Sequence, residues 1–332
     1  MNLYFPPLMY LFFLFSGTMI SVSSSSLFGM WMGLEINLMS FIPIIINLEN
    51  NKKSSEAAIK YFLIQAIASA SLIFSALLFY LLNSSVFSFT PNIMMSLTLC
   101  VKLGMAPFHF WFPEVMEGLS WFNSLILLTW QKISPLVILS LFFYPNVLIT
   151  TALMSSIIGA ISGFNQTSMR KILAFSSISH LGWISSIMYF NSTVWLNYFL
   201  LYCFTSFILC VSFWMMNLNY FSQLMLKKDL NQKFIIFINL LSLGGLPPLL
   251  GFVPKMIGMF VISINFPILM ILIISSLITL YFYTRLCFST FTLFSQYTAW
   301  NLKTKTTKNF YLLSSLTIFS LIGILPMTLI NL

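Results

Sequence analysis

The chain has 332 residues, of which 59% are hydrophobic and only 6% are charged, and its net charge is +9. Soluble domains carry about 25% charged residues, so a soluble enzyme, a secreted disulfide scaffold and a disordered protein are all excluded. The remaining class is a helical protein that crosses a membrane many times, because apolar stretches of about 18–25 residues recur along the chain. The basic residues lie in short loops between these stretches, which favours a role in topology over nucleic-acid binding.

The sequence carries no pattern typical of a bound metal, cluster or nucleotide. Its four cysteines lie inside apolar segments without a C-x-x-C spacing, and His109 and His180 are far apart. It contains neither G-x-G-x-x-G nor a Walker loop. We therefore expect no cofactor in this chain. The first apolar run has no basic leader and no Arg-rich transit peptide precedes it, so we expect a retained span.

In chain order, hydropathy predicts eleven membrane spans, of which the fourth and ninth are overlong and interrupted by glycine and proline. If the N-terminus is on side A, the loops of side A receive 11 of the 15 basic residues and side B receives none. By the positive-inside rule, side A corresponds to the cytoplasm. The predicted spans are 3–20, 27–47, 58–82, 92–119, 121–143, 147–164, 172–190, 194–216, 234–262, 266–287 and 309–331. The basic loop residues are Lys52, Lys53, Arg170, Lys171, Lys227, Lys228, Lys233, Arg285, Lys303, Lys305 and Lys308.

The two overlong spans share a motif. Residues 103–107 and 243–247 both read L-G-x-x-P, and each is followed by a second proline, Pro113 or Pro254. Proline removes an amide donor and glycine loosens the backbone, so each span should break there. Because the freed carbonyls cannot face lipid, they should line a polar cavity. Five helices separate the fourth span from the ninth, so the two run in opposite directions, which indicates an inverted repeat with discontinuous helices. The alternative is a pair of simple proline kinks.

Four charged residues are predicted deep inside the spans. Glu35, Lys102 and Lys132 lie about 12, 15 and 17 Å from the start of their spans, and Lys255 follows the second break. Each buried charge costs about 2.5–3.5 kcal/mol. A fixed pair with Glu35 explains one lysine and leaves at least two others without an acid. Burial and like-charge repulsion make the proton of such a lysine mobile, so we predict that all four residues serve proton transfer.

Three further residues have two readings each. Lys60 lies near the start of the third span, where it either takes part in proton transfer or extends to the side A surface. His109 lies in the first break, as a proton relay or as a cap for free carbonyls. His180, in the middle of the seventh span, either bridges the two half-channels or is a hydrogen-bonded core residue.

These segments together resemble the subunit 2 family of mitochondrial NADH:ubiquinone oxidoreductase, respiratory complex I, in its arthropod form. They cover most of residues 27–262 and are specific as a set. The matching stretches are WMGLEIN from Trp31, SEAAIKYFLIQ from Ser55, KLGMAPFHFWFPEV from Lys102, WQKISPL from Trp130, RKILAFSSISHLGW from Arg170 and GGLPPLLGFVPK from Gly244.

The resemblance implies an all-α membrane fold of two inverted five-helix repeats, at residues 1–145 and 146–290, with a loop and closing helix at 291–332. It implies proton translocation coupled to electron transfer by other subunits, which bind NADH, FMN, iron–sulfur clusters and ubiquinone. It places the chain in the mitochondrial inner membrane, beside other membrane-arm subunits, with its N-terminus in the matrix.

The resemblance also assigns roles to the charged residues. Lys102 would be the proton carrier of the first half-channel, modulated by Glu35 and tuned by Lys60. Lys132 would link the halves, and Lys255 would gate the second. Two other functions are kept open: an Mrp-type cation/proton antiporter subunit, which would carry similar buried charges, and a structural membrane subunit that does not pump.

Overall fold

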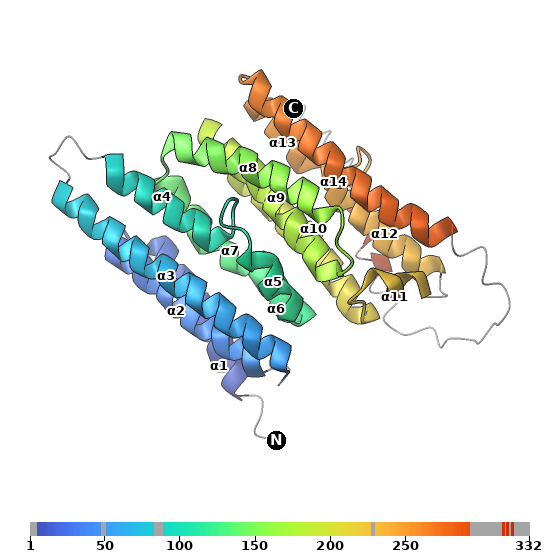
Figure 1. Ribbon diagram of the computed structural model, residues 1–332, viewed down its shortest axis with the longest axis horizontal. Helices are drawn as coiled ribbons and strands as arrows, with labels where there is room; N and C mark the ends of the chain where they lie inside the picture. Colours follow the sequence, from blue (N-terminus) through green and yellow to red (C-terminus); the bar gives the residue numbers. More distant parts are fainter. Residues whose placement is uncertain are drawn as a thin grey trace. The chain divides into compact units, whose positions relative to one another are not determined.

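The structure is a computed structural model that describes residues 5–47, 51–82, 89–226 and 230–292 and six positions between 314 and 321 (Figure 1). Within these ranges the regular elements are helices, apart from one isolated bridge between Ser168 and Tyr220. Seven of the helical segments are long and apolar enough to cross a membrane, and shorter apolar helices accompany them. The predicted class, an all-α protein with many membrane spans, is confirmed.

Two compact units divide the chain between Ser155 and Ser156, inside helix α8 (Pro145–Gly163). The repeat boundaries predicted from the sequence, and the inverted relation of the two repeats, stay predictions. The first unit contains α1 (Phe5–Ser23), α2 (Leu27–Asn47), α3 (Lys52–Leu82), α4 (Phe89–Leu103), α5 (Trp111–Gly118), α6 (Trp121–Leu128) and α7 (Trp130–Leu141). Helix α3 packs against α2, α4 and α5, and α7 packs against α1, α2, α4 and α6.

The second unit is built around α9. Its helices are α9 (Met169–Phe190), α10 (Val194–Met216), α11 (Phe221–Leu226), α12 (Leu230–Gly244), α13 (Phe252–Ile262) and α14 (Phe266–Thr292). Helix α9 is buried along nearly all its length and packs against α10, α13 and α14. Its serine hydroxyls, whose exposure to lipid would be unfavourable, donate hydrogen bonds to backbone carbonyls of the preceding turn.

Both overlong spans are broken helices, as the L-G-x-x-P motifs predict. The fourth span consists of α4 and α5, and the ninth consists of α12 and α13. Gly104 and Gly245 adopt φ angles of 70° and 82°. At the first break the Met105 amide donates to the Cys100 carbonyl and the Gly104 amide to the Val101 carbonyl, and the same pattern recurs at Gly245. These are Schellman motifs, which end a helix where glycine can take the left-handed conformation.

The fifth predicted span is also divided, which the sequence does not predict. Helix α6 ends at Leu128 and α7 begins at Trp130, with Thr129 between them. The Thr129 hydroxyl donates to the Leu125 carbonyl at 2.7 Å. Such back-bonding by threonine competes with the helical ladder and bends helices.

Six of the basic residues predicted to lie in loops are in helices, so their assignment to loops is wrong. Lys52 and Lys53 begin α3, Arg170 and Lys171 lie in the first turn of α9, and Lys233 and Arg285 belong to α12 and α14. Lys233 belongs to α12, which begins four residues before the predicted span, and its ammonium donates to the Met225 carbonyl at 3.0 Å. Capping a carbonyl of α11 lets the charge be buried beside an apolar helix. Arg285 is an exposed residue of α14. Lys227, Lys228, Lys303, Lys305, Lys308 and most of the eleventh predicted span lie outside the described residues.

Candidate proton-transfer site

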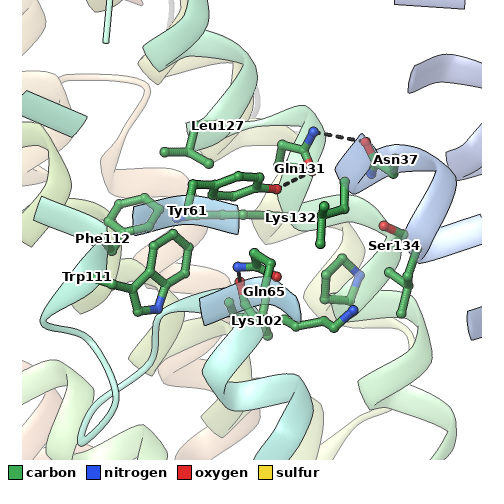
Figure 2. A pocket seen from close by; sticks show the side chains of 14 residues that line it. Asn37, Tyr61, Gln65, Lys102, Trp111, Phe112, Leu127, Gln131, Lys132 and Ser134 are labelled. Atoms are coloured by element: carbon green, nitrogen blue, oxygen red, sulfur yellow. Dashed lines mark hydrogen bonds between the residues drawn. The ribbon is translucent and has the colours of Figure 1, made fainter. Parts of the chain in front are cut away.

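Two of the predicted lysines meet at one small cavity in the first unit (Figure 2). Lys102 and Lys132 are only 7% and 2% exposed, and both line a cavity of about 20 Å³. That volume holds about one water molecule. Both lysines therefore belong to one candidate site.

Helix α4 positions Lys102. The residue lies in the last turn, just before the Schellman motif, where the partial negative charge of the helix end favours a cation. The carboxylate of Glu35, on α2, interacts electrostatically with this ammonium. Within the part of the chain that the structure describes, the buried Oε2 atom of Glu35 has no hydrogen-bond partner. Glu35 is therefore an electrostatic neighbour of Lys102.

Lys132 lines the cavity from α7. Its Nζ atom lies 5.0 Å from the centre of the Phe112 ring, a cation–π distance. Phe112 belongs to α5, the half-helix that follows the first break. The aromatic face thus provides a weakly polar partner that does not bind the proton of the lysine.

A chain of neutral polar side chains surrounds these lysines, which the sequence reasoning missed. The Tyr61 hydroxyl donates to Gln131 Oε1 at 3.3 Å, and Gln131 Nε2 donates to Asn37 Oδ1 at 2.9 Å. Gln65 Nε2 donates to the Lys102 carbonyl at 3.3 Å, one of the carbonyls freed by the break. Figure 2 shows these side chains converging from α2, α3 and α7 on the cavity.

A sequence signal for this network exists. Tyr61 and Gln65 are four residues apart and so share one face of a helix, and Gln131 precedes Lys132 directly. Polar residues on the same helical face as a buried charge, inside an otherwise apolar span, are therefore candidates for its supporting contacts. Trp111, whose indole donates to the Val101 carbonyl at 3.1 Å, caps another freed group in the same way.

Lys60 and His109 lie apart from this cluster. The Lys60 ammonium pairs with the Glu114 carboxylate at 2.6 Å, and the two side chains are 50% and 54% exposed. This pair joins α3 to α5, so the structure brings Lys60 to Glu114. His109 is buried in the turn between α4 and α5, where its ring packs on Phe110 and interacts with the Pro107 backbone. That position is closer to the capping alternative.

The second unit holds a corresponding site beside its own break. Lys255, 4% exposed on α13, donates from Nζ to the Gly244 carbonyl at 2.6 Å, and so caps the end of α12. Together with His180 and several hydroxyl side chains, it lines a cavity of about 10 Å³. The remaining lining residues are Ser179, Trp183, Ser275, Ser276 and Thr279.

His180 has the contact expected of a core histidine, and its role as a bridge between the half-channels stays a prediction. Its Nδ1 atom lies 2.9 Å from the Tyr198 hydroxyl, which makes it a hydrogen-bonded core histidine. The same ring lines the cavity of Lys255. Among the described residues no group of three or more His, Cys, Asp or Glu is arranged to hold a metal ion.

Comparisons with known proteins show which family the chain belongs to. A family model described as NADH:quinone oxidoreductase/Mrp antiporter matches residues 24–280. NADH-ubiquinone oxidoreductase chain 2 of Anopheles gambiae is 48% identical over 301 residues, covering 89% of this chain and 88% of that protein. The chain belongs to this family. It is therefore a membrane subunit of the NADH-ubiquinone oxidoreductase type, as the sequence resemblance implies.

Solved structures share the family's fold. A chain of respiratory complex I from Thermus thermophilus aligns with a TM-score of 0.84 at 22% identity, covering 97% of this chain and 78% of that one. A chain of the Mrp complex from Dietzia aligns with a TM-score of 0.73 at 16% identity, covering 83% of this chain and 59% of that one. The fold is thus common to both kinds of assembly, whereas the high sequence identity is to the oxidoreductase chain.

Proposed function

We propose that this subunit translocates protons across the mitochondrial inner membrane, driven by electron transfer from NADH to ubiquinone in other subunits. The observation that carries the proposal is the pair of buried ammonium groups, Lys102 and Lys132, on one water-sized cavity beside a broken helix. NADH, FMN, iron–sulfur clusters and ubiquinone would be bound by those other subunits. This chain would contribute the proton path and no redox centre.

The geometry supports a stepwise transfer. A proton that reaches Lys102 is held by the Glu35 carboxylate and by the negative end of α4. Repulsion between two ammonium groups around one cavity favours release from one when the other is charged. A single water in the cavity would relay the proton, while the Tyr61–Gln131–Asn37 chain holds the walls in place.

Lys255 would act in the same way in the second unit. Its ammonium is held by the Gly244 carbonyl and its cavity is lined by hydroxyl groups and His180. These groups accept and donate protons without carrying a fixed charge. Lys60, paired with Glu114 on the surface, would set the field near the first break and would not itself enter the path.

The alternative of an Mrp-type antiporter shares the fold, as the Dietzia comparison indicates. The identity of 48% to an oxidoreductase chain favours the first function. A structural subunit that does not pump would gain little from two cations buried at one cavity, since burying a charged side chain is costly.

Lys102 provides the first test. Lys102→Ala should lower proton pumping by about tenfold or more, the scale of a lost proton-transfer group, while the complex still assembles. Lys102→Arg should also impair pumping, because arginine keeps its proton. Proton release per electron, measured in reconstituted vesicles, is the readout, and Lys52→Ala, at the exposed start of α3, is the matched control.

Normal pumping by the arginine variant would show that a fixed charge at this position suffices. The structural alternative would then explain the lysine, and the proposal would fail for the first unit.

A further inference from the structure

Arg285 lies in a part of the chain that offers almost no carboxylates. Residues 156–332 contain ten basic residues and a single acidic one, Asp229, which is outside the described residues. The Arg285 side chain is exposed on α14, and its guanidinium carbon lies 5.1 Å from the centre of the Phe164 ring. Phe164 in turn stacks on Tyr281, with ring planes 10° apart. The cation is thus oriented by aromatic contacts.

Beside this arginine is a cavity of about 290 Å³, much larger than those at the buried lysines. Asn165, Gln166 and Thr167, from the connection between α8 and α9, supply its polar wall. Six of the eleven lining residues are apolar, including Ile172 and Phe282, which are fully buried. The volume is at the lower end of small-molecule sites, about 300 Å³, and the lining suits a ligand with one polar and one apolar end.

The arginine also terminates an exposed apolar stripe. Ile274, Leu277 and Tyr281 are 53%, 59% and 57% exposed on α14, and their spacing of three and four residues places them on the same helical face as Arg285. From Ile274 to Arg285 the helix rises by about 16 Å. This matches half of a hydrocarbon core about 30 Å thick.

From these three observations we propose that the cavity binds the phosphodiester group of an anionic phospholipid. The Arg285 guanidinium donates to the phosphate oxygens, a pairing for which its planar fork of donors is suited. The side chains of Asn165 and Thr167 supply further donors, and an acyl chain lies along Tyr281, Leu277 and Ile274. This lipid site is independent of the proton-transfer proposal.

A soluble phosphate shares the headgroup chemistry, but it would use only the polar part of the site. The apolar majority of the wall and the stripe next to it contribute to binding only if the ligand has a hydrocarbon chain, because their gain comes from apolar contact. The excess of basic over acidic residues favours an anionic lipid over a zwitterionic one.

Photolabelling of the intact complex tests the site. The complex is reconstituted in phosphatidylcholine vesicles with a minor share of photoactivatable phosphatidylglycerol, and cross-linked peptides are mapped by mass spectrometry. We expect labels in residues 163–172 and 274–286. Arg285→Gln should reduce them by about tenfold, the effect of losing a charge-assisted hydrogen bond, and Arg285→Lys by less. Lys171→Gln removes the same charge from the first turn of α9, outside the cavity lining, and should leave labelling unchanged.

Three outcomes would overturn the proposal. Equal labelling in the wild type and Arg285→Gln would show that the arginine binds no headgroup. An equal loss in Lys171→Gln would show general attraction to a basic surface. Complete displacement of the label by inorganic phosphate would identify a site for a soluble anion. If Arg285→Gln does not assemble, Arg285→Lys carries the test, because it keeps the charge while losing the fork of donors.

Discussion

Gly245 lies where the end of α12 and the side chain of Lys255 meet. Its φ of 82° is in the left-handed region, and a Cβ atom there would be 2.9 to 3.1 Å from the Cδ, Nζ and Cε atoms of Lys255. Only a residue without a side chain satisfies both conditions. The position of the Lys255 ammonium therefore depends on this glycine as well as on the Gly244 carbonyl.

Gly245→Ala should thus lower both stability and pumping. An alanine in the left-handed region costs about 1–2 kcal/mol, and its methyl group would push Lys255 from the α12 terminus. The measurements are the thermal midpoint of the complex and proton release per electron. Gly244→Ala is the matched control. A Cβ atom on Gly244 would lie 3.2 Å from its nearest neighbour, a ring atom of Tyr283, and the φ of Gly244 is not positive. Equal effects of the two substitutions would contradict the role given to Gly245.

The amide of Gln131 is shared between Tyr61 and Asn37, which are its partners on α3 and α2. Gln131→Leu should destabilise the first unit by about 1–3 kcal/mol, because it leaves a buried amide oxygen on Asn37 without its donor. Asn37→Leu should have a similar effect. The double variant should cost less than the sum, with a coupling of about 0.5–1.5 kcal/mol, measured by denaturation of the complex. Strict additivity would show that the two side chains do not support each other.

At the scale of whole helices, α1 and α2 pack closely through glycine. A Cβ atom on Gly33 would lie 2.5 Å from the Ser21 amide nitrogen and 2.6 Å from the Gly17 carbonyl oxygen. Both contacts are with the backbone of α1, so no side-chain movement relieves them. Small residues that bring backbones together are a common basis of helix association in membranes. Glu35 is two residues further along α2, so its position follows from this packing.

Gly33→Ala should therefore separate α1 from α2 and displace Glu35. We expect a marked loss of assembled complex, measured by native gel electrophoresis, and lower pumping in what remains. Gly29→Ala, on the same helix, contacts only serine side chains near the helix start and should assemble normally. Normal assembly of Gly33→Ala would mean that the helices pack with more tolerance than these distances imply.

The two kinds of helix break show what the sequence determines locally. The two breaks could be predicted because glycine and proline in L-G-x-x-P act on their own backbone, whatever surrounds them. The left-handed residue is the motif glycine, Gly104, in the first break and the following glycine, Gly245, in the second. The division at Thr129 lacks such a signal, since threonine back-bonding is optional and depends on context. The class of protein and the burial of Lys102, Lys132 and Lys255 could also be predicted, because both follow from the hydropathy of the surrounding segment.

The supporting contacts of the site could not be predicted in the same way. Gln131 and Asn37 are 94 residues apart, and only packing of α7 against α2 brings them together. Lys60 illustrates the converse: its motif indicates a role near Lys102, whereas its contact with Glu114 depends on the half-helix α5, 54 residues away. Long-range pairs of this kind are fixed by tertiary structure and leave little trace in one sequence.

For the molecule as a whole, the distribution of charge predicts orientation. The loop with Lys227 and Lys228 should be cleaved by trypsin from the matrix side only, because basic loops are retained on the side of synthesis. Inside-out inner-membrane vesicles should give the cut and intact mitoplasts should not, with the fragments identified by mass spectrometry. Cleavage in mitoplasts would reverse the orientation proposed for the N-terminus.

The size of the two lysine cavities has a consequence for the resting membrane. With about 20 Å³ at Lys102 and Lys132 and about 10 Å³ at Lys255, neither cavity holds more than about one water. One water molecule does not form a continuous hydrogen-bonded chain, so in this conformation neither cavity by itself conducts protons between the two aqueous phases. Under the proposed function, transfer requires that the helices part and admit more water for a moment. Tight packing around the broken helices would then limit proton leakage across the membrane between turnovers.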